Sequence, residues 1–521
     1  MSLRSRPTAV GRGELSIADV VRVAIGQADV VLEPAAHDRM LASRAVIERA
    51  LERGESVYGL TTGVGPQKRV AVSLADQVRF NRLMVMAHCV GHGPKAPAEF
   101  VRAAMFVRAE GLALGAAGVR PELVERLVDA LNAGMTPTVH LIGSVGQGDL
   151  SPLAEIARAL IGAGSEADLM ARAGLRPVKL APREALALIS SNAFSIGIAA
   201  LAVHQARTAL MALERSTALA FEGFVANVSA LDPAVGRLRP HDGIGQTIRC
   251  VRAQLEEGAL LTGARVARNL QDPLCFRVVP QTHAAARHAL DHAEGLIETE
   301  LRSAADNPAV LAGEDRVVGQ GNHDMTLIVV ALDYVRLALA QAVTIANERI
   351  QKLLDPRFSG LPSGLREAHE LIEDGLGVVG HGAAALAAEI RLLAAPVALE
   401  LPTSSAAEGI EDRVTLAPVA ARRLHEMTGY VTRLAAVELV CAAQAVDLRG
   451  VARDLGRGTS TAYAAVRASM PFVAAGQAPL DDLEPLVAWL AAAGDDPNQQ
   501  PALIAVAPTR VGWAATISTS A

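Results

Sequence analysis

The sequence predicts an all-α protein with a long central bundle of helices. Of its 521 residues, 51% are hydrophobic and only 3% are aromatic, so Ala, Leu and Val must fill the interior. This composition favours closely packed helices over sheet sandwiches. Long helical patterns follow one another through the second part of the chain, over residues 194–222, 244–268, 279–303, 325–354 and 417–453.

The pattern at 325–354 illustrates how these helices are recognised. Apolar residues recur there at spacings of three and four, while Asp333 and Arg336 occupy the other side: Leu332, Val335, Leu339 and Ala342. Turn residues separate the patterns, as in Asp306-Asn307-Pro308 and Asp355-Pro356. Helices with such broad apolar faces also predict oligomerisation, because one layer of them leaves much apolar surface exposed.

The chain divides into three expected regions. Residues 1–193 alternate short helical patterns with glycine-rich turns, 194–470 form the long-helix bundle, and 471–521 form an irregular capping tail.

Composition also excludes several classes of function. The net charge is -6 without a dense Lys/Arg run, which argues against a nucleic-acid partner. Four separated cysteines predict neither a disulfide framework nor a zinc site, and a start without an apolar segment does not resemble a secretory signal, so we expect a cytoplasmic protein. The uncharged stretch 185–206 contains polar residues, which predicts a buried helix and no membrane span. The scattered histidines suggest no metal site.

The segment 143–153 begins Gly143-Ser144-Val145-Gly146-Gln147-Gly148-Asp149-Leu150. It resembles the signature of the histidine and phenylalanine ammonia-lyases except at its centre. In that family an Ala-Ser-Gly triplet before Asp-Leu cyclises into methylidene-imidazolone, the electrophile that captures the substrate's amino group. Here the three positions are Gly146, Gln147 and Gly148, and the segment is one residue shorter. A glutamine has no β-hydroxyl to lose, so the degenerate segment predicts a protein without this cofactor.

The resemblance extends over residues 15–455 in several blocks. It implies an ammonia-lyase/fumarase-like fold and a homotetramer with shared active sites. The block at 57–65 is similar to the family's Tyr-Gly-x-x-Thr-Gly loop, which makes Tyr58 the candidate base on a mobile lid. A phenol serves as a base near neutral pH only if positive charge or hydrogen-bond donors lower its pKa. The alternative is a tyrosine that anchors a turn.

Two further blocks supply candidate substrate contacts. The block at 86–93 is similar to Ser-His-x-x-Gly, where the family's histidine lies beside the substrate ring, so His88 is expected to recognise a ring. In the block at 271–281, Arg277 matches the arginine that grips the substrate carboxylate, a task suited to a planar two-pronged donor. An interhelical ion pair is its alternative role. Leu274 stands where the family usually has a tyrosine.

The remaining blocks are less regular. The block at 180–192 resembles Leu-Ala-Pro-Lys-Glu-Gly, with Ser190 in place of the asparagine expected to contact the electrophile. The segment 319–323 resembles Gly-Gly-Asn-Phe, which makes Asn322 a candidate substrate ligand. Glu411, in the block 401–414, matches a glutamate that faces the imidazole, although a helix-start acid is an equal alternative. His92, His323 and His381 receive no role.

Three departures thus surround one place: the missing triplet, Ser190 and Leu274. A chain that keeps the base and the carboxylate clamp but discards the electrophile implies a small zwitterionic substrate whose leaving group needs no activation. A quaternary amine meets this condition, because it departs as a neutral tertiary amine. The resemblance then narrows to an ergothionase-like carbon–nitrogen lyase that eliminates trimethylamine from ergothioneine or hercynine. The alternatives are an inactive lyase-like scaffold or binding protein, and a conventional ammonia-lyase.

Overall fold

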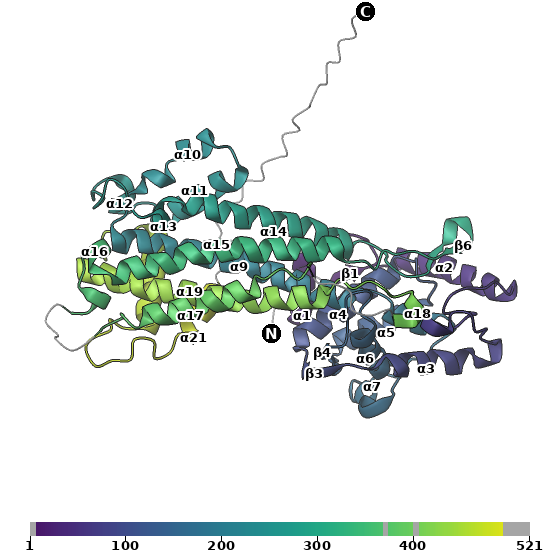
Figure 1. The fold of residues 1–521 in the computed structure, drawn as a ribbon. Coiled ribbons are helices and arrows are strands. Elements are labelled where there is room, and N and C mark those ends of the chain that lie inside the picture. The colour runs from purple at the N-terminus through teal and green to yellow at the C-terminus, as the bar shows by residue number, and fades with distance from the viewer. Residues whose placement is uncertain (1–6, 368–373, 400–405, 493–521) are drawn as a thin grey trace, which may run out of the picture.

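The computed structural model describes residues 7–367, 374–399 and 406–492. It is mostly helical and elongated, with the expected bundle of long helices along its length (Figure 1). The long helices are α9 (Ala193–Phe224), α14 (Val279–Leu301), α15 (Thr326–Leu354), α17 (Val379–Leu393) and α19 (Ala417–Arg449). The predicted all-α fold class is therefore confirmed. The three-region division stays a prediction, and part of its tail, 493–521, lies outside the described residues.

The helices of the first part of the chain cluster at one end of the bundle (Figure 1). They are α1 (Ile17–Ala24), α2 (Pro34–Glu52), α3 (Gln77–His88), α4 (Ala98–Ala113), α5 (Pro121–Asn132), α6 (Leu150–Leu160), α7 (Leu169–Arg172) and α8 (Glu184–Ile189). Short strands pair there in three two-stranded sheets: β1 (Thr8–Val10) with β2 (Val30–Leu32) in parallel, and, antiparallel, β3 (His92–Lys95) with β4 (His140–Ile142) and β5 (Ala309–Leu311) with β6 (Arg316–Val318).

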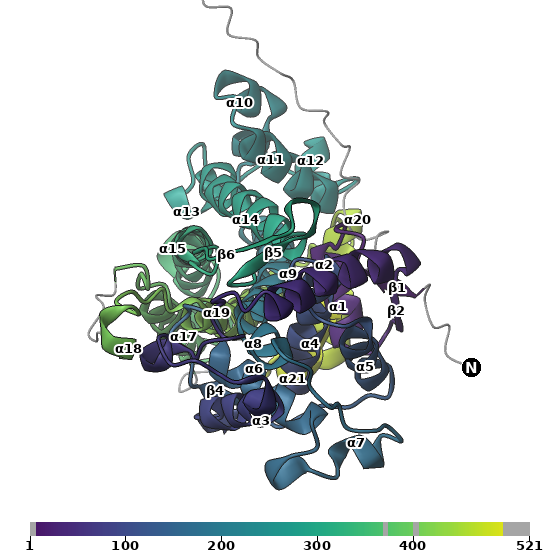
Figure 2. The same cartoon turned by 90° about the vertical axis from the view of Figure 1, so that its right-hand side faces the viewer.

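The other helices flank or cap the bundle. They are α10 (Pro233–Leu238), α11 (Asp242–Leu255), α12 (Ala259–Thr262), α13 (Leu274–Arg277), α16 (Pro356–Ser359), α18 (Ala406–Gly409), α20 (Arg457–Ser469) and α21 (Glu484–Ala492). Seen end-on, α10, α11 and α12 project on one side of α9, and α7 projects on the opposite side (Figure 2).

Small residues let α9 pack closely against its neighbours. A Cβ added at Gly197 would lie 3.0 Å from Ala103 of α4, and one at Gly223 would lie 2.7 Å from the carbonyl oxygen of Ala442 in α19. A buried ion pair crosses the same core, where Nε of Arg349 lies 2.5 Å from Oε1 of Glu438. Interiors tolerate such a pair only when both charges are also hydrogen-bonded. The Ala-rich composition thus produces tightly packed helices with a few satisfied charges between them.

Two segments, 184–224 and Thr326–Leu354, are long and apolar enough to cross a membrane by length and composition alone. The apolar window of the first is 94% buried inside the fold. This burial is that of a core helix, as the polar residues in 185–206 predicted.

The predicted helix at 244–268 is wrong in its extent. The structure ends α11 at Leu255 and forms only the single turn α12 beyond it. Glu257 adopts a positive φ of 70°, and a Cβ at Gly258 would lie 2.6 Å from the amide nitrogen of Gly456. The chain therefore turns at the point where the backbone at the start of α20 packs against it. Helical periodicity does not predict such a long-range contact.

Candidate functional site

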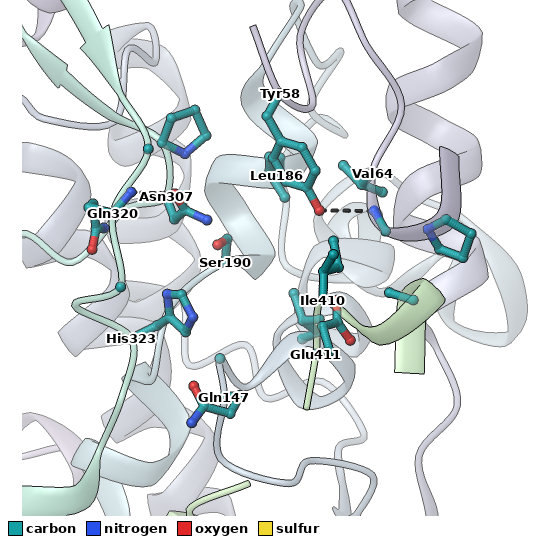
Figure 3. Close-up of a pocket in the computed structure, with 18 of the residues that line it drawn as sticks. Tyr58, Val64, Gln147, Leu186, Ser190, Asn307, Gln320, His323, Ile410 and Glu411 are labelled. Carbon is teal, nitrogen blue, oxygen red and sulfur yellow. Dashed lines mark hydrogen bonds between the residues drawn. The ribbon is translucent and has the colours of Figure 1, made fainter. Parts of the chain in front are cut away.

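A large pocket lies at the end of the bundle where the short helices gather. Its volume is about 1130 Å³, and its walls come from six separate parts of the chain (Figure 3). The lining includes the predicted residues Tyr58, His88, Gln147, Ser190 and Glu411. Five residues spread over more than 350 positions of sequence thus meet in one cavity.

Tyr58 lies on the loop that follows α2, and its phenol points across the pocket (Figure 3). Its Oη accepts a hydrogen bond from the amide of Gly65 at 2.9 Å. Gly65 has a φ of 55°, a left-handed conformation that glycine adopts without strain. Burial raises the pKa of Tyr58, the Gly65 donor lowers it, and the charge of Glu411 raises it again; the net shift is upward. Of the two kinds of group that could lower this pKa, the described residues of the single chain supply a hydrogen-bond donor, the Gly65 amide, but no positive charge.

His88 ends α3 and is half-buried at the pocket wall. Its Nδ1 lies 2.7 Å from the carbonyl oxygen of Met84. A carbonyl only accepts, so Nδ1 carries the proton and Nε2 of the neutral ring is an acceptor. Ser190 is the C-cap of α8 and lines the pocket as well.

The degenerate segment forms a rigid loop beneath the pocket. The carbonyl of Gly146 accepts from Oγ1 of Thr415 at 2.6 Å, and the amide of Gly148 donates to Oδ1 of Asn192 at 3.0 Å. Gly146 and Gly148 both have a φ of 82°. The next residue, Asp149, is buried, and its Oδ1 accepts from the hydroxyl of Ser144 at 2.8 Å. Burial, despite these donors, raises the pKa of Asp149, which indicates a structural anchor.

Gln147 and Asp324 form the central polar contact of the site. Nε2 of Gln147 lies 3.0 Å from Oδ2 of Asp324, which also accepts from Nε of Arg413 at 2.8 Å. The amide and hydroxyl of Thr326 donate to Oδ1 at the start of α15. Partial burial opposes ionisation of Asp324, but the donors from Thr326, Arg413 and Gln147 hold its pKa well below the usual range. These donors therefore favour the ionised carboxylate.

Glu411 projects from an exposed segment that follows α18 and faces the lid. The segment is fixed to the lid by Lys68, whose Nζ lies 2.9 Å from Oε2 of Glu408. It is fixed to the pocket floor by the Arg413–Asp324 ion pair. The beginning of the predicted block, Leu401–Ser404, lies outside the described residues.

Two predicted substrate contacts lie elsewhere in the single chain. Arg277 ends α13, at the far end of the bundle, where the carbonyl of the nearby Cys275 accepts from Arg349 at 3.1 Å (Figure 1). Between Thr326 at the pocket and Arg349, α15 rises by roughly 35 Å at about 1.5 Å per residue. Asn322 is exposed beside the pocket, outside its lining, with its amide bound to Oε1 of Gln320. The roles of Arg277 and Asn322 stay predictions.

Of the histidines without an assigned role, one lies at the pocket and two lie outside it. His323 lines the pocket, whereas His92 on β3 and His381 on α17 are exposed outside it. Leu274 lies on α13 with Arg277 and is 60% exposed.

Sequence reasoning missed Asp324 and Arg413. Asp324 directly follows the motif that ends at His323, and Arg413 lies inside the block 401–414, two residues after Glu411. Three carboxylates, Asp324, Glu411 and Asp412, line the pocket against the single guanidinium of Arg413. Within the part of the chain that the structure describes, no group of His, Cys, Asp or Glu is arranged to hold a metal ion.

A bundle of long helices with a tyrosine-bearing loop and a charged pocket at one end is the arrangement expected of a helical carbon–nitrogen lyase. The chain belongs to the aromatic amino acid lyase family, whose model matches residues 15–468. It is 36% identical to a histidine ammonia-lyase of Symbiobacterium thermophilum, over 87% of this chain and 90% of that protein.

Two solved structures are similar along nearly the whole chain. Ergothionase from Treponema denticola, in complex with desmethyl-ergothioneine sulfonic acid, has a TM-score of 0.88 and 27% identity over 96% of this chain and all of that one. Tyrosine aminomutase from Streptomyces globisporus has a TM-score of 0.87 and 30% identity over 94% and 97%.

The residues at 146–148 do not fit the family's methylidene-imidazolone. Gln147 lacks the hydroxyl that must leave as water, and its side chain is bound to Asp324. Its backbone also pairs with Asp324 in an isolated antiparallel bridge. Loop 143–148 therefore presents an amide where the family presents an electrophile.

Proposed function

We propose that this protein eliminates trimethylamine from a histidine-derived betaine, ergothioneine or hercynine, to give a urocanate-type product. The observation that carries the proposal is Gln147, which stands in the electrophile's place while the lid tyrosine and the pocket around it are retained. The amine of such a substrate must leave without covalent activation. A quaternary amine does so, because it departs as a neutral molecule.

The proposed reaction balances without a cofactor. The phenolate of Tyr58 takes the β-proton, and the electron pair of that C–H bond becomes the second bond between Cα and Cβ. The Cα–N bond breaks at the same stage, and its electron pair leaves with the nitrogen as trimethylamine. Tyr58 then returns its proton to solvent. Gly65 donates to the Tyr58 oxygen and so stabilises the phenolate, as a general base at this position requires.

The ring and the carboxylate of the substrate account for the other predicted residues. His88, with Nε2 as an acceptor, and Glu411 would contact the imidazole-type ring. Arg277 would grip the carboxylate from a neighbouring subunit, because within its own chain it lies at the far end of the bundle. The pocket volume of about 1130 Å³ exceeds the usual range for small ligands, roughly 300–1,000 Å³, which is consistent with walls completed by other subunits.

An apolar stripe on α15 supports the homotetramer that this arrangement needs. Four side chains on one face of the helix are between 43% and 68% exposed: Leu327, Val330, Tyr334 and Leu337. Their spacings of three and four define a continuous face that a second copy of the chain would cover.

The likeness to histidine ammonia-lyase and to ergothionase favours an imidazole-type ring over a phenol or phenyl ring. A conventional ammonia-lyase remains the second candidate on that sequence identity, although its electrophile cannot form at Gln147. An intact mass equal to that of the unmodified sequence would exclude that candidate, whereas a loss of water from residues 146–148 would restore it.

The deciding experiment is incubation of the purified protein with ergothioneine and with hercynine. We expect trimethylamine and a conjugated product that absorbs in the ultraviolet from at least one of them. Free histidine serves as the control substrate and should release no ammonia. An absence of product from both betaines would refute the proposal and favour the inactive scaffold.

A further inference from the structure

The side chain of Gln147 has a fixed orientation. Its Nε2 lies 3.0 Å from Oδ2 of Asp324, an ionised carboxylate that can only accept hydrogen bonds. Asp324 is itself held by Arg413 and by Thr326 at the start of α15. The amide group of Gln147 must therefore turn its nitrogen towards Asp324 and its oxygen away from it.

The oxygen of this amide faces the pocket. Figure 3 shows Oε1 of Gln147 on the side of His323 and Ser190, both of which line the cavity. Among the described residues, no hydrogen-bond donor reaches this oxygen. An electron-rich oxygen at residue 147 thus points into the pocket from the segment in which the family has its electrophile.

We propose that Oε1 of Gln147 contacts the quaternary ammonium group of the substrate and forms part of its binding site. A quaternary ammonium has no N–H to donate and spreads its charge over its methyl groups, so carbonyl oxygens and carboxylates stabilise it without directional hydrogen bonds. A primary ammonium group would also bind this oxygen, through an N–H donor, so the oxygen favours a cationic amine of either kind. Gln147 contacts the leaving group in this proposal, and Asp324 is a positioning residue that acts through it. This inference rests on the proposed function.

The surroundings have the charge that a cation needs. Three carboxylates line the pocket against one guanidinium, and that guanidinium is paired with Asp324. The charge of Asp324 lies directly behind the Gln147 amide and polarises it towards the cavity. Arg413 also lines the pocket and donates to the same oxygen of Asp324 as Gln147, so its positive charge is paired with that carboxylate beside the amide.

The test uses the full-length protein and an inert probe, tetramethylammonium chloride, with binding measured by calorimetry. Gln147→Leu keeps the side-chain size but removes the oxygen, and Asp324→Asn is a second variant that leaves Gln147 in place but frees its orientation. Arg172→Gln, at an exposed site on α7, is the matched control. Neopentyl alcohol, a neutral molecule of similar shape, controls for the charge of the probe.

We expect wild-type protein and Arg172→Gln to bind tetramethylammonium equally and more tightly than neopentyl alcohol. Binding to Gln147→Leu and Asp324→Asn should weaken roughly tenfold, as expected when one polar contact to a charge is lost. Unchanged binding in Gln147→Leu, or no saturable binding by the wild-type protein, would overturn the inference.

The betaine assay separates this inference from the proposed function. If the wild-type protein binds tetramethylammonium as described but releases trimethylamine from neither betaine, the proposed reaction is refuted and the cation-binding site at Gln147 is supported. If the wild-type protein turns a betaine over and Gln147→Leu does so with unchanged KM and kcat, the cation-binding site at Gln147 is refuted and the proposed reaction is supported.

Discussion

Burial and the nearby charge of Glu411 outweigh the hydrogen bond from Gly65 and raise the pKa of Tyr58 in the single chain, which favours the protonated phenol. A general base must lose that proton before it acts. We therefore expect Tyr58→Phe to reduce kcat for trimethylamine release by about 10²–10⁴-fold, the usual contribution of a positioned base. The measurement is initial rate with the more reactive betaine, with circular dichroism to verify the fold. A binding protein would be indifferent to the loss of this hydroxyl, so an unchanged rate in an active preparation would remove Tyr58 from the mechanism.

Glu411 gives a pH-dependent test at the same scale. The rate should rise as pH approaches the pKa of Tyr58, because only the phenolate accepts the proton. Since burial and then the negative charge of Glu411 raise that pKa, Glu411→Gln should lower it. The rising limb of kcat/KM should then move to lower pH, while KM increases through the lost ring contact.

The matched control for this shift is Asp412→Asn. This change removes a carboxylate that lines the same pocket but is not among the groups that shift the pKa of Tyr58. Equal displacement of the limb in both variants would indicate a general change in pocket potential and would contradict the specific pairing of Glu411 with Tyr58.

At the scale of elements, loop 143–148 holds the pocket floor through two glycines in the same backbone conformation. A Cβ at Gly146 would lie 2.4 Å from Oγ1 of Thr415 and 2.6 Å from the amide nitrogen of Ala417, whereas one at Gly148 would approach only Leu150, at 3.9 Å. Both residues have a φ of 82°. Alanine at either position therefore incurs the same backbone strain, but only position 146 also incurs a clash.

We expect Gly148→Ala to lower the free energy of unfolding by roughly 1–2 kcal/mol through this strain. Gly146→Ala should cost about 1–3 kcal/mol more, because Thr415 and the start of α19 must shift. Chemical denaturation of both variants measures the difference. Equal losses would show that the Thr415 contact does not constrain the loop.

The elements also show which features a sequence can predict. Of the five long helices that the sequence predicts, four appear close to their expected limits, because their apolar periodicity reflects burial along the whole helix. The helix at 244–268 breaks after Leu255, since the contact between Gly258 and Gly456 joins residues about 200 positions apart. The motifs placed Tyr58, His88, Ser190 and Glu411 at one pocket. The role of Asp324 could not be predicted from the sequence, because its partners Gln147 and Arg413 are distant along the chain and only the fold brings them together.

At the scale of the whole molecule, the exposed stripe on α15 predicts self-association in solution, and the family resemblance implies that the oligomer is a tetramer. Light scattering coupled to gel filtration should give about four times the mass of the chain. Leu327→Lys and Leu337→Lys together place two charges on the stripe and should shift the mass towards smaller species, because charges at the centre of an interface are costly to bury. Arg172→Gln, on α7, should leave the mass unchanged. A monomeric wild-type protein would contradict both the interface and a shared site.

A shared site makes a sharper prediction, which depends on the separation of Tyr58 and Arg277 along the bundle. If each pocket takes Tyr58 from one chain and Arg277 from another, then Tyr58→Phe and Arg277→Gln tetramers are each deficient. Mixed tetramers, formed by co-expression of the two variants with different tags, would contain some pockets with both native residues. We expect tandem purification of the mixed species to recover a substantial fraction of wild-type kcat, with wild-type KM. If both residues served the same pocket from one chain, every pocket would carry one defect and no activity would return. Mixing the two proteins after separate assembly, without subunit exchange, is the control, and it should remain as deficient as its parents.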